Sequence, residues 1–163
     1  MRRVVPLLLV FLILLAGCSA ASAPETTEPA GQMQIGNPWK TYSSLADAEN
    51  ACGLTYPIPE NIPEGFTVES YCVMSSSLLE VTYINGDTEI TVRMLSAENQ
   101  DISGVYEDFT ETETFTQGSA AVTKMMAADC CVYLVHKSGY SFSIYATSLT
   151  ADDTCREILS YIC

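Results

Sequence analysis

Seven cysteines and a single histidine are the residues of this 163-residue chain with the most distinctive chemistry. Thiolates attack electrophiles, bind metal ions and form disulfides, and a catalytic thiol needs a base within hydrogen-bond reach. The only histidine, His136, is the first candidate for such a base. The first cysteine, Cys18, follows an apolar leader, and the other six are Cys52, Cys72, Cys130, Cys131, Cys155 and Cys163.

A nucleophile and base within one strand are excluded by spacing. A strand over 131–136 would place Cys130 and His136 on one face, because alternate side chains of a strand share a face. Six residues of strand separate them by about 20 Å. A cysteine on another strand, such as Cys72, could still meet His136. We expect His136 to be a strand-end residue near a turn, and we predict that the protein is not an enzyme.

Adjacent Cys130 and Cys131 are the only closely spaced cysteines, which suggests a vicinal redox pair. Their side chains would point to opposite sides of a strand, so each would need a different partner. Zinc sites usually show closely spaced pairs of Cys and His, and the acidic run 101–108 lacks the spacing of a calcium loop. We predict no metal site and no cofactor, with a thiol-redox protein using Cys130 or Cys131 as an alternative.

The six cysteines after Cys18 form an even set, which outside the cytoplasm permits up to three disulfides in any of 15 pairings. Cys155 and Cys163 cannot pair with each other. Eight residues of helix separate their backbones by about 12 Å, whereas a disulfide needs alpha carbons within about 7 Å. Two interpretations of these cysteines remain. They form structural disulfides, or they are buried thiols that behave as small apolar side chains.

The start of the chain has the pattern of an export signal. Arg2 and Arg3 precede an apolar run from Val4 to Leu15, which is shorter than the roughly 20 residues of a permanent membrane span. The following residues, 15–18, resemble the lipobox of bacterial lipoproteins. The resemblance implies cleavage before Cys18, acylation of Cys18 with fatty acids such as palmitate, and a lipid anchor on the outer face of a cell membrane. An ordinary secreted protein is the alternative.

Three segments follow from this pattern: a signal peptide (1–17), a flexible tether (18–36) rich in Ala, Ser, Thr, Pro and Glu, and a single domain (37–163). Loss of the leader removes two of the seven basic residues and leaves 20 acidic ones, a formal charge of −15. Such a surface repels nucleic acid and anionic lipid. A cationic ligand or basic protein would be attracted, although acidity also keeps an exported domain soluble.

Helices are predicted at both ends of the domain. Ser43 or Ser44 can cap the first, with Asp47 in its first turn and Gly53 at its exit. Thr150 is the expected cap of the last helix. The apolar stripe of that helix consists of Cys155, Ile158, Leu159 and Ile162.

Between the helices, apolar and polar residues alternate, which predicts strands with one buried face. With Asn85-Gly86 as a hairpin turn, Val81 lies opposite Ile90 and Leu79 opposite Val92. Further strands are predicted over 112–116, 120–125, 131–136 and 140–147. We therefore predict an α+β fold, in which an antiparallel sheet of five to seven strands has an N-terminal and a C-terminal helix packed on one face.

On the other face of the sheet, Arg93 and Glu80 are predicted to pair across this hairpin. An exposed ion pair contributes at most about 1 kcal/mol. If a second layer covered that face, however, the pair would become a candidate ligand site.

Several short motifs of the domain point to a family. They are Asn37-Pro38-Trp39, 44–49 with Gly53, 62–66, 81–83, Glu89-Ile90 with Arg93, 101–104 and 140–144. With these motifs the domain resembles a family of small cell-surface lipoprotein domains of unknown function from Gram-positive bacteria. The resemblance implies an extracytoplasmic domain without an assigned activity. The cysteines depart from the family pattern, so any disulfide would be a local addition.

Three hypotheses of function follow. The first is a non-catalytic, membrane-anchored domain that binds an envelope protein, a peptide or a wall component, and does not bind nucleic acid. The second is a carrier that encloses an apolar ligand between the sheet and the helices. The third is the thiol-redox protein.

Overall fold

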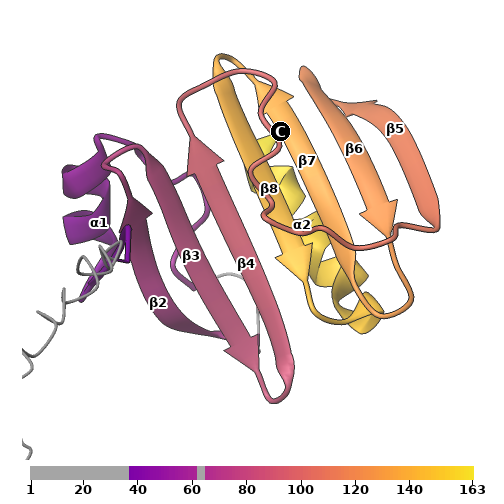
Figure 1. Cartoon of the computed structure of the whole chain (residues 1–163), viewed down its shortest axis with the longest axis horizontal. Coiled ribbons are helices and arrows are strands. Elements are labelled where there is room, and N and C mark those ends of the chain that lie inside the picture. The colour runs from indigo at the N-terminus through magenta and orange to yellow at the C-terminus, as the bar shows by residue number, and fades with distance from the viewer. Residues whose placement is uncertain (1–36, 62–64) are drawn as a thin grey trace, which may run out of the picture. The chain divides into compact units, whose positions relative to one another are not determined.

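The described residues, 37–61 and 65–163, build one eight-stranded antiparallel sheet in this computed structural model (Figure 1). The strands are β1 (Trp39–Tyr42), β2 (Thr67–Met74), β3 (Leu78–Asn85), β4 (Thr88–Leu95), β5 (Glu111–Gln117), β6 (Ala120–Met126), β7 (Cys131–Lys137) and β8 (Tyr140–Ala146). The helices are α1 (Leu45–Cys52), the short 3₁₀ helix η1 (Leu149–Ala151) and α2 (Asp152–Ile162). The predicted signal peptide, Cys18 and tether lie outside the described residues.

Two meanders make up the sheet, whose strand order is β1-β2-β3-β4-β8-β7-β6-β5. After β4 the chain crosses to the far edge and returns through β5, β6 and β7, so that the last strand, β8, pairs with β4 in the middle of the sheet. The connection between the meanders, residues 96–110, contains no helix or strand and is called here the crossing loop. An irregular connection of this length is uncommon and is often functional.

The predicted α+β class, the antiparallel sheet and the C-terminal helix are confirmed. The predicted count of five to seven strands is too low, because none of the strands named from the sequence corresponds to β1 or β2. The strand β1 is only four residues long, and its burial does not alternate as a half-buried strand would. It is recognisable only through its pairing with β2, where Trp39 lies opposite Met74 and Tyr42 opposite Tyr71.

The hairpin between β3 and β4 forms with a different register from the one predicted. Val81 lies opposite Val92 rather than Ile90, because the turn is centred on Gly86 and Asp87. Gly86 has a φ of 59° at the first central position, where a type II′ hairpin turn takes glycine. A shift of two residues leaves every side chain on its predicted face.

The helix ends follow local side-chain chemistry. The hydroxyl of Ser44 accepts a hydrogen bond from the backbone N–H of Asp47 at 3.2 Å, and Gly53 ends α1 with a φ of 69°. The prediction of Thr150 as the cap of the last helix is wrong. Ser148 caps η1 instead, by accepting from the N–H of Thr150, and α2 continues directly from η1.

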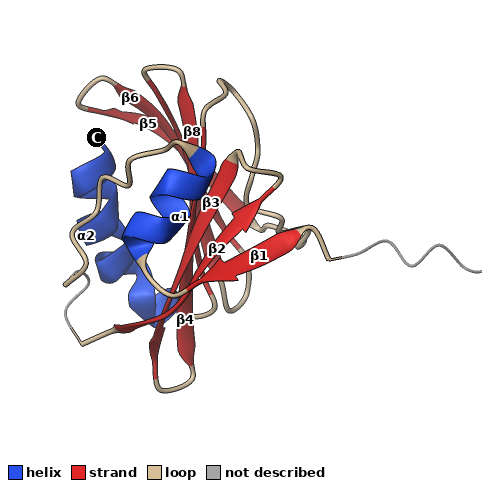
Figure 2. Ribbon diagram, turned by 90° about the vertical axis from the view of Figure 1, so that its left-hand side faces the viewer, coloured by secondary structure: helices blue, strands red, loops and turns tan. Residues whose placement is uncertain are grey.

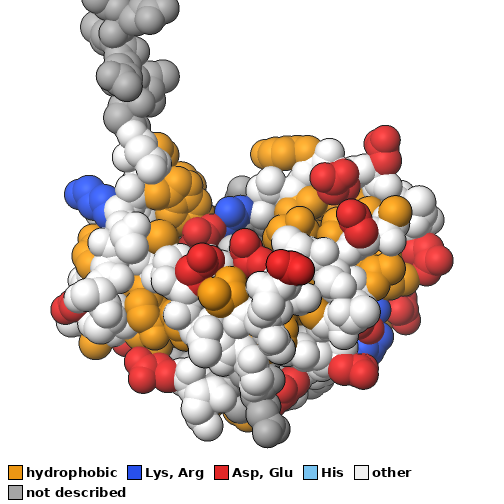
Figure 3. Space-filling view, turned by 90° about the horizontal axis from the view of Figure 1, so that it is seen from below, with side chains coloured by type: hydrophobic (Ala, Val, Ile, Leu, Met, Phe, Trp, Pro, Cys, Tyr) orange, Lys and Arg blue, Asp and Glu red, His pale blue; other side chains and the backbone are white. Residues whose placement is uncertain are grey.

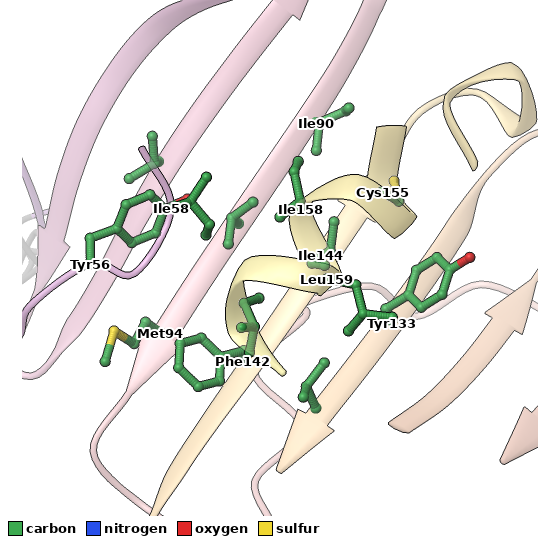
Figure 4. Close-up of a cluster of buried hydrophobic side chains, with 14 of the residues drawn as sticks. Tyr56, Ile58, Ile90, Met94, Tyr133, Phe142, Ile144, Cys155, Ile158 and Leu159 are labelled. Carbon is green, nitrogen blue, oxygen red and sulfur yellow. The ribbon is translucent and has the colours of Figure 1, made fainter. Parts of the chain in front are cut away.

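One face of the sheet, called here the core face, carries the hydrophobic core. Its buried side chains from the sheet include Val81, Tyr83, Ile90, Val92, Tyr133, Val135, Phe142 and Ile144. The predicted stripe of α2 packs against them, and Leu45 and Ala48 of α1 belong to the same cluster. Figure 4 shows Ile158 and Leu159 of α2 over Ile144, with Ile58 from the segment after α1 in the same core.

The opposite face of the sheet, called here the loop face, lies under part of the crossing loop (Figures 1 and 2). Its central residues are small and polar, and several are buried even though they are not in the core cluster. These are Thr82, Thr91, Ser141 and Ser143, with Val132 and Leu134 beside them on β7. The second face of the sheet is therefore partly covered, and its cover is a loop instead of a helix.

Candidate functional site

Hydrogen bonds from a buried serine on β8 fix the start of the crossing loop. The hydroxyl of Ser141 donates to the carbonyl oxygen of Ala97 at 2.7 Å and accepts from the N–H of Gln100 at 3.1 Å. Ser141 is completely buried. A buried hydroxyl must find hydrogen-bond partners to offset its loss of water. The crossing loop provides these partners for Ser141, and the same two bonds hold the start of the loop against the sheet.

Arg93 on β4 fixes the middle of the crossing loop. Its Nε donates to Glu80 Oε2 at 2.7 Å, and its Nη1 donates to the carbonyl oxygens of Ile102 and Ser103 at 3.1 and 2.5 Å. The side chains of Arg93 and Glu80 are only 21% and 15% exposed. The predicted surface pair is therefore a partly buried pair beneath a second layer, which is the condition that makes it a site candidate.

The crossing loop is shaped to approach this guanidinium group. Gly104 has a φ of 66°, which favours glycine, and a β-carbon at this position would lie 2.3 Å from Arg93 Nη1, so a larger residue would displace the guanidinium group. Asp101 Oδ1 accepts from both the N–H and the hydroxyl of Ser103, at 2.9 and 2.7 Å. These local bonds hold the loop in a single turn conformation over Arg93.

A pocket of about 370 Å³ opens between the crossing loop and the end of the first meander. We call it the aromatic pocket. Apolar side chains from strands β1 to β4 and from the crossing loop form its walls, and they include Trp39, Met74, Leu78, Leu95, Ile102 and Tyr106. Arg93 lies at the same site with its guanidinium carbon 5.5 Å from the centre of the Trp39 ring, within the range of a cation–π contact.

Two features of the rim of the aromatic pocket are unusual for a soluble domain. Tyr106 is 97% exposed, the highest value among the exposed large apolar side chains of the described residues. Ser75 and Ser76, in the turn between β2 and β3, have φ values of 52° and 57°. Non-glycine residues in this region are strained by the order of 1 kcal/mol each, and such strain often accompanies function.

His136 lies at the end of β7 next to a turn, as predicted, and its Nδ1 is 3.2 Å from Ser141 Oγ. Because the Ser141 proton is donated to Ala97, the histidine acts here as a hydrogen-bond donor that helps hold the loop. This serine is not arranged as a nucleophile. Cys72 lies on β2, four strands from β7 and so about 19 Å away, and the proposed meeting of Cys72 with His136 does not occur.

The six cysteines of the domain are dispersed over its helices, strands and turns. Cys131 lies in the core, whereas Cys130 is buried outside the core cluster, so the two diverge as predicted. Burial raises the pKa of the Cys130 thiol, and the nearby Asp129 carboxylate adds to this effect. Cys131 on β7 and Cys155 on α2 are both fully buried in the core cluster.

The other three cysteines of the domain are half-buried and lie apart from one another. Cys52 donates to the carbonyl oxygen of Ala48 within its own helix at 3.1 Å. Cys72 contacts the hydroxyl of Thr41 at 3.5 Å, and Cys163 is at the end of α2. All six cysteines of the domain are free thiols in this structure.

Within residues 37–61 and 65–163, no three side chains of His, Cys, Asp or Glu gather as metal ligands would, and Asp101, Glu107 and Asp108 form no such group. None of the helices in the described part of the chain has the length and apolar character needed to cross a bilayer.

A second, smaller recess bears on the carrier hypothesis. It has a volume of about 280 Å³ and opens at the edge of the core, where Pro57, Met94, Tyr140, Phe142 and Ile162 line it. Beneath it the core is filled by side chains such as those in Figure 4. The recess is slightly smaller than typical ligand pockets, which span roughly 300 to 1,000 Å³.

The sequence pointed to part of this site. The Arg93 and Glu80 pair was predicted, but the participation of Trp39 and Tyr106 was not. Tyr106 carried a usable signal, since it is the one large aromatic side chain between residues 97 and 108, a stretch otherwise dominated by polar residues. Trp39 had been interpreted only as part of the start of the domain.

Comparisons of the chain with protein-family models, with curated proteins and with solved structures found no match. The resemblance to a family of cell-surface lipoprotein domains therefore stays a prediction from its motifs.

Proposed function

We propose that this protein is a membrane-anchored extracytoplasmic lipoprotein whose domain binds a peptide segment of an envelope partner, without catalysis, in the aromatic pocket. In this proposal α1 and α2 together cover the core face of the sheet (Figure 2) and leave the loop face for binding. The anchor is the acylated Cys18, and the tether is residues 18–36. The observation that carries the proposal is the aromatic pocket itself, with its exposed Tyr106 beside a fixed arginine.

The composition of the pocket supports recognition of a peptide. Tyrosine, tryptophan and arginine are the residues most often found at the energetic centres of protein interfaces. Trp39 and Tyr106 offer rigid apolar area for one side chain of a partner. Because Arg93 is already held by a carboxylate, two carbonyls and a ring, it would lose little conformational freedom on binding.

The charges around Arg93 indicate which kind of hydrogen-bond acceptor a ligand would offer it. The Nη2 group of Arg93 has no hydrogen-bond partner among the described residues, so its two N–H groups are available to a ligand. Glu80 neutralises the positive charge at 2.7 Å, and Figure 3 shows acidic side chains spread among hydrophobic ones on one face of the domain. A neutral carbonyl of a peptide backbone therefore suits this position better than an anion.

A display experiment tests this function. Random dodecapeptides displayed on phage would be selected against the full-length protein in detergent micelles, and the selected peptide would be titrated against variants. We expect Tyr106→Ala to weaken binding at least tenfold, since an interfacial tyrosine anchor commonly contributes more than 1.4 kcal/mol. Tyr161→Ala is the matched control, because Tyr161 is an exposed tyrosine on α2. If no peptide is enriched, or if both variants bind equally well, the pocket is not the binding site.

The anchor has its own test, which is independent of the pocket. The intact mass of the protein from bacterial membranes should correspond to a chain that begins at Cys18 and carries acyl groups. Cys18→Ser should release the protein from the membrane fraction. A full-length mass with the leader attached, or an unmodified cysteine, would contradict the anchor.

The recess at the edge of the core supports a second candidate, a carrier of an apolar ligand. Its lining by Met94, Tyr140 and Phe142 suits a short acyl or aromatic group. Binding of a fluorescent fatty acid to the wild-type protein, and loss of that binding in Met94→Trp, would support this role. Absence of any fatty-acid binding to the wild type would count against it.

A further inference from the structure

The wall of the aromatic pocket contains a carboxylate beside an exposed aromatic ring. Asp101 and Tyr106 of the crossing loop both line the pocket, together with Arg93 of β4. We propose that Asp101 and Tyr106 form a subsite for the basic side chain of a lysine or arginine in the bound peptide. This inference rests on the peptide-binding function proposed above, and it names the class of peptide that the pocket selects.

The carboxylate of Asp101 is held in place and keeps one oxygen free. Its Oδ1 accepts from the N–H and from the hydroxyl of Ser103, at 2.9 and 2.7 Å. Ser103 is only 5% exposed, so this part of the crossing loop is anchored. Asp101 itself is exposed, and its Oδ2 has no hydrogen-bond partner among the residues that the structure describes. A carboxylate that is already oriented loses little conformational freedom when it binds a cation.

Tyr106 offers the face of an aromatic ring to the same cation. Its side chain is 97% exposed, so the ring is not covered by other side chains. The hydroxyl of Ser103 accepts from the N–H of Val105 at 3.3 Å, so the hydrogen bonds that hold Asp101 extend to the residue before Tyr106. An ammonium or guanidinium group is attracted to a tyrosine ring when it lies within about 6 Å of the ring centre. The aliphatic stem of the basic side chain would meanwhile cover apolar wall of the pocket.

The ring of Trp39 does not suit a second cation. The guanidinium carbon of Arg93 already lies 5.5 Å from the centre of this ring, so a ligand cation there would meet a like charge. Arg93 is paired with Glu80 at 2.7 Å, which limits its repulsion of a cation beside Asp101. The aromatic pocket therefore has two polar subsites: Arg93 donates to a carbonyl of the peptide, and Asp101 attracts a positive charge.

The charge of the crossing loop favours the same class of ligand. Residues 96–110 contain no lysine, arginine or histidine, and their four acidic residues are Glu98, Asp101, Glu107 and Asp108. Asp101 is the one of these four that lines the aromatic pocket. A basic peptide is drawn toward this loop and an acidic peptide is repelled.

Paired peptides test the inference. In the peptide selected by phage display, each lysine or arginine is replaced in turn by norleucine, a neutral residue similar in length to lysine. Binding to the full-length protein in detergent micelles is followed through the fluorescence of Trp39, the only tryptophan of the chain. We expect one of these replacements to weaken binding about tenfold, because it removes both an ion pair and a cation–π contact.

Asp101→Asn identifies the partner of that basic side chain. Asparagine keeps the Oδ1 that accepts from Ser103, so the crossing loop should keep its conformation. We expect Asp101→Asn to bind the parent peptide about fivefold more weakly and to bind the norleucine peptide as the wild type does.

Glu98→Gln is the matched control. It removes the same charge from an exposed position of the same loop, but Glu98 does not line the aromatic pocket. It should change the affinity for either peptide by no more than about twofold, because salt screens charges outside the pocket.

Salt provides a second readout that a merely structural role of Asp101 would not move. Raising sodium chloride from about 50 mM to about 500 mM should weaken binding of the parent peptide to the wild type more than to Asp101→Asn. Equal salt dependence of the two proteins would count against an ion pair with Asp101.

The outcomes separate this inference from the function on which it rests. If the selected peptides need Tyr106 but contain no basic residue, or if every norleucine peptide binds as tightly as the parent, the pocket binds peptides and the basic subsite is wrong. If Asp101→Asn and Glu98→Gln weaken binding equally, the general charge of the loop attracts the peptide and the role of Asp101 is wrong. If no peptide is enriched at all, both proposals fail.

Discussion

The two faces of the sheet are buried by different physical means. On the core face, Ile144 and Ile158 are fully buried in a continuous apolar cluster. On the loop face, Arg93 and Ser141 hold a segment without helix or strand through hydrogen bonds to its carbonyl groups. The comparison indicates that apolar packing on the core face provides most of the stability. On the loop face, hydrogen bonds hold the crossing loop in place.

The largest effect is expected on the core face. Ile158→Ala should lower the free energy of unfolding by about 3 kcal/mol, because it removes buried methylene groups and leaves a cavity between α2 and the sheet. Denaturation by urea, followed by far-ultraviolet circular dichroism, measures this. Leu149→Ala is the control, since Leu149 is 40% exposed and should change stability by no more than about 0.5 kcal/mol. If both substitutions lower the free energy of unfolding equally, the core face is not the main source of stability.

A smaller effect is expected on the loop face. Arg93→Ala should cost about 2 kcal/mol, because it leaves Glu80 and two loop carbonyls without their donor. Hydrogen exchange should show faster exchange of the amides of Gln100 and Ser103 in the crossing loop, with little change in β7. The control is Lys40→Ala, which removes an exposed positive charge on β1. If the amide exchange rates of the crossing loop are unchanged in Arg93→Ala, Arg93 does not hold the loop.

The pH dependence of stability tests a charged cluster at the core face, formed by Asp152 with Lys124 and Arg156. Burial alone would raise the pKa of Asp152, but hydrogen bonds from Lys124, Tyr133 and Arg156 outweigh burial and lower it. Because the folded-state pKa lies below that of the unfolded chain, the carboxylate stabilises the fold above about pH 4, and this stability is lost as the pH falls through the folded-state value.

Asp152→Asn should therefore be less stable than the wild type by about 1 kcal/mol at pH 7, with the difference shrinking toward pH 3. Urea unfolding at several pH values measures this, with Asp153→Asn, an exposed neighbour, as the control. A difference that stays constant with pH would mean that the carboxylate charge does not contribute.

The smallest effect on stability is expected at the aromatic pocket. Tyr106→Ala should change the melting temperature by less than about 2 °C, because a side chain that is 97% exposed has little packing to lose. Differential scanning fluorimetry checks this. Combined with the loss of peptide binding expected above, this outcome would separate binding from folding. A marked loss of stability would instead mean that Tyr106 supports the crossing loop.

Local signals in the sequence were sufficient for much of the fold. The alternation through β3, β4 and β8 predicted which side chains share the core face, although it did not predict the burial of Thr82, Thr91, Ser141 and Ser143 on the loop face. The cap at Ser44 and the glycine at Gly53 marked the ends of α1. The register of the hairpin failed by two residues because Gly86 can occupy either central position of a turn. Face assignment depends only on the parity of positions, so it survived the error.

The site was harder to predict because it depends on distant pairings. Arg93 and Glu80 are close in a hairpin and were recognised, but Trp39 reaches them only through the pairing of β1 with β2. Neither periodicity nor spacing contains that information, and the cysteine count alone left 15 pairings open.

The central position of β8 has a consequence for how the chain is made. This strand is the last one in sequence, yet it joins the two meanders by pairing with β4. Until residues 140–146 have emerged, β4 has an unpaired edge and the sheet is two incomplete halves, so its formation depends on contacts of high sequence separation. The domain therefore completes its sheet only after residues 140–146 have been made, and a truncation before Tyr140 removes the strand that joins the two meanders.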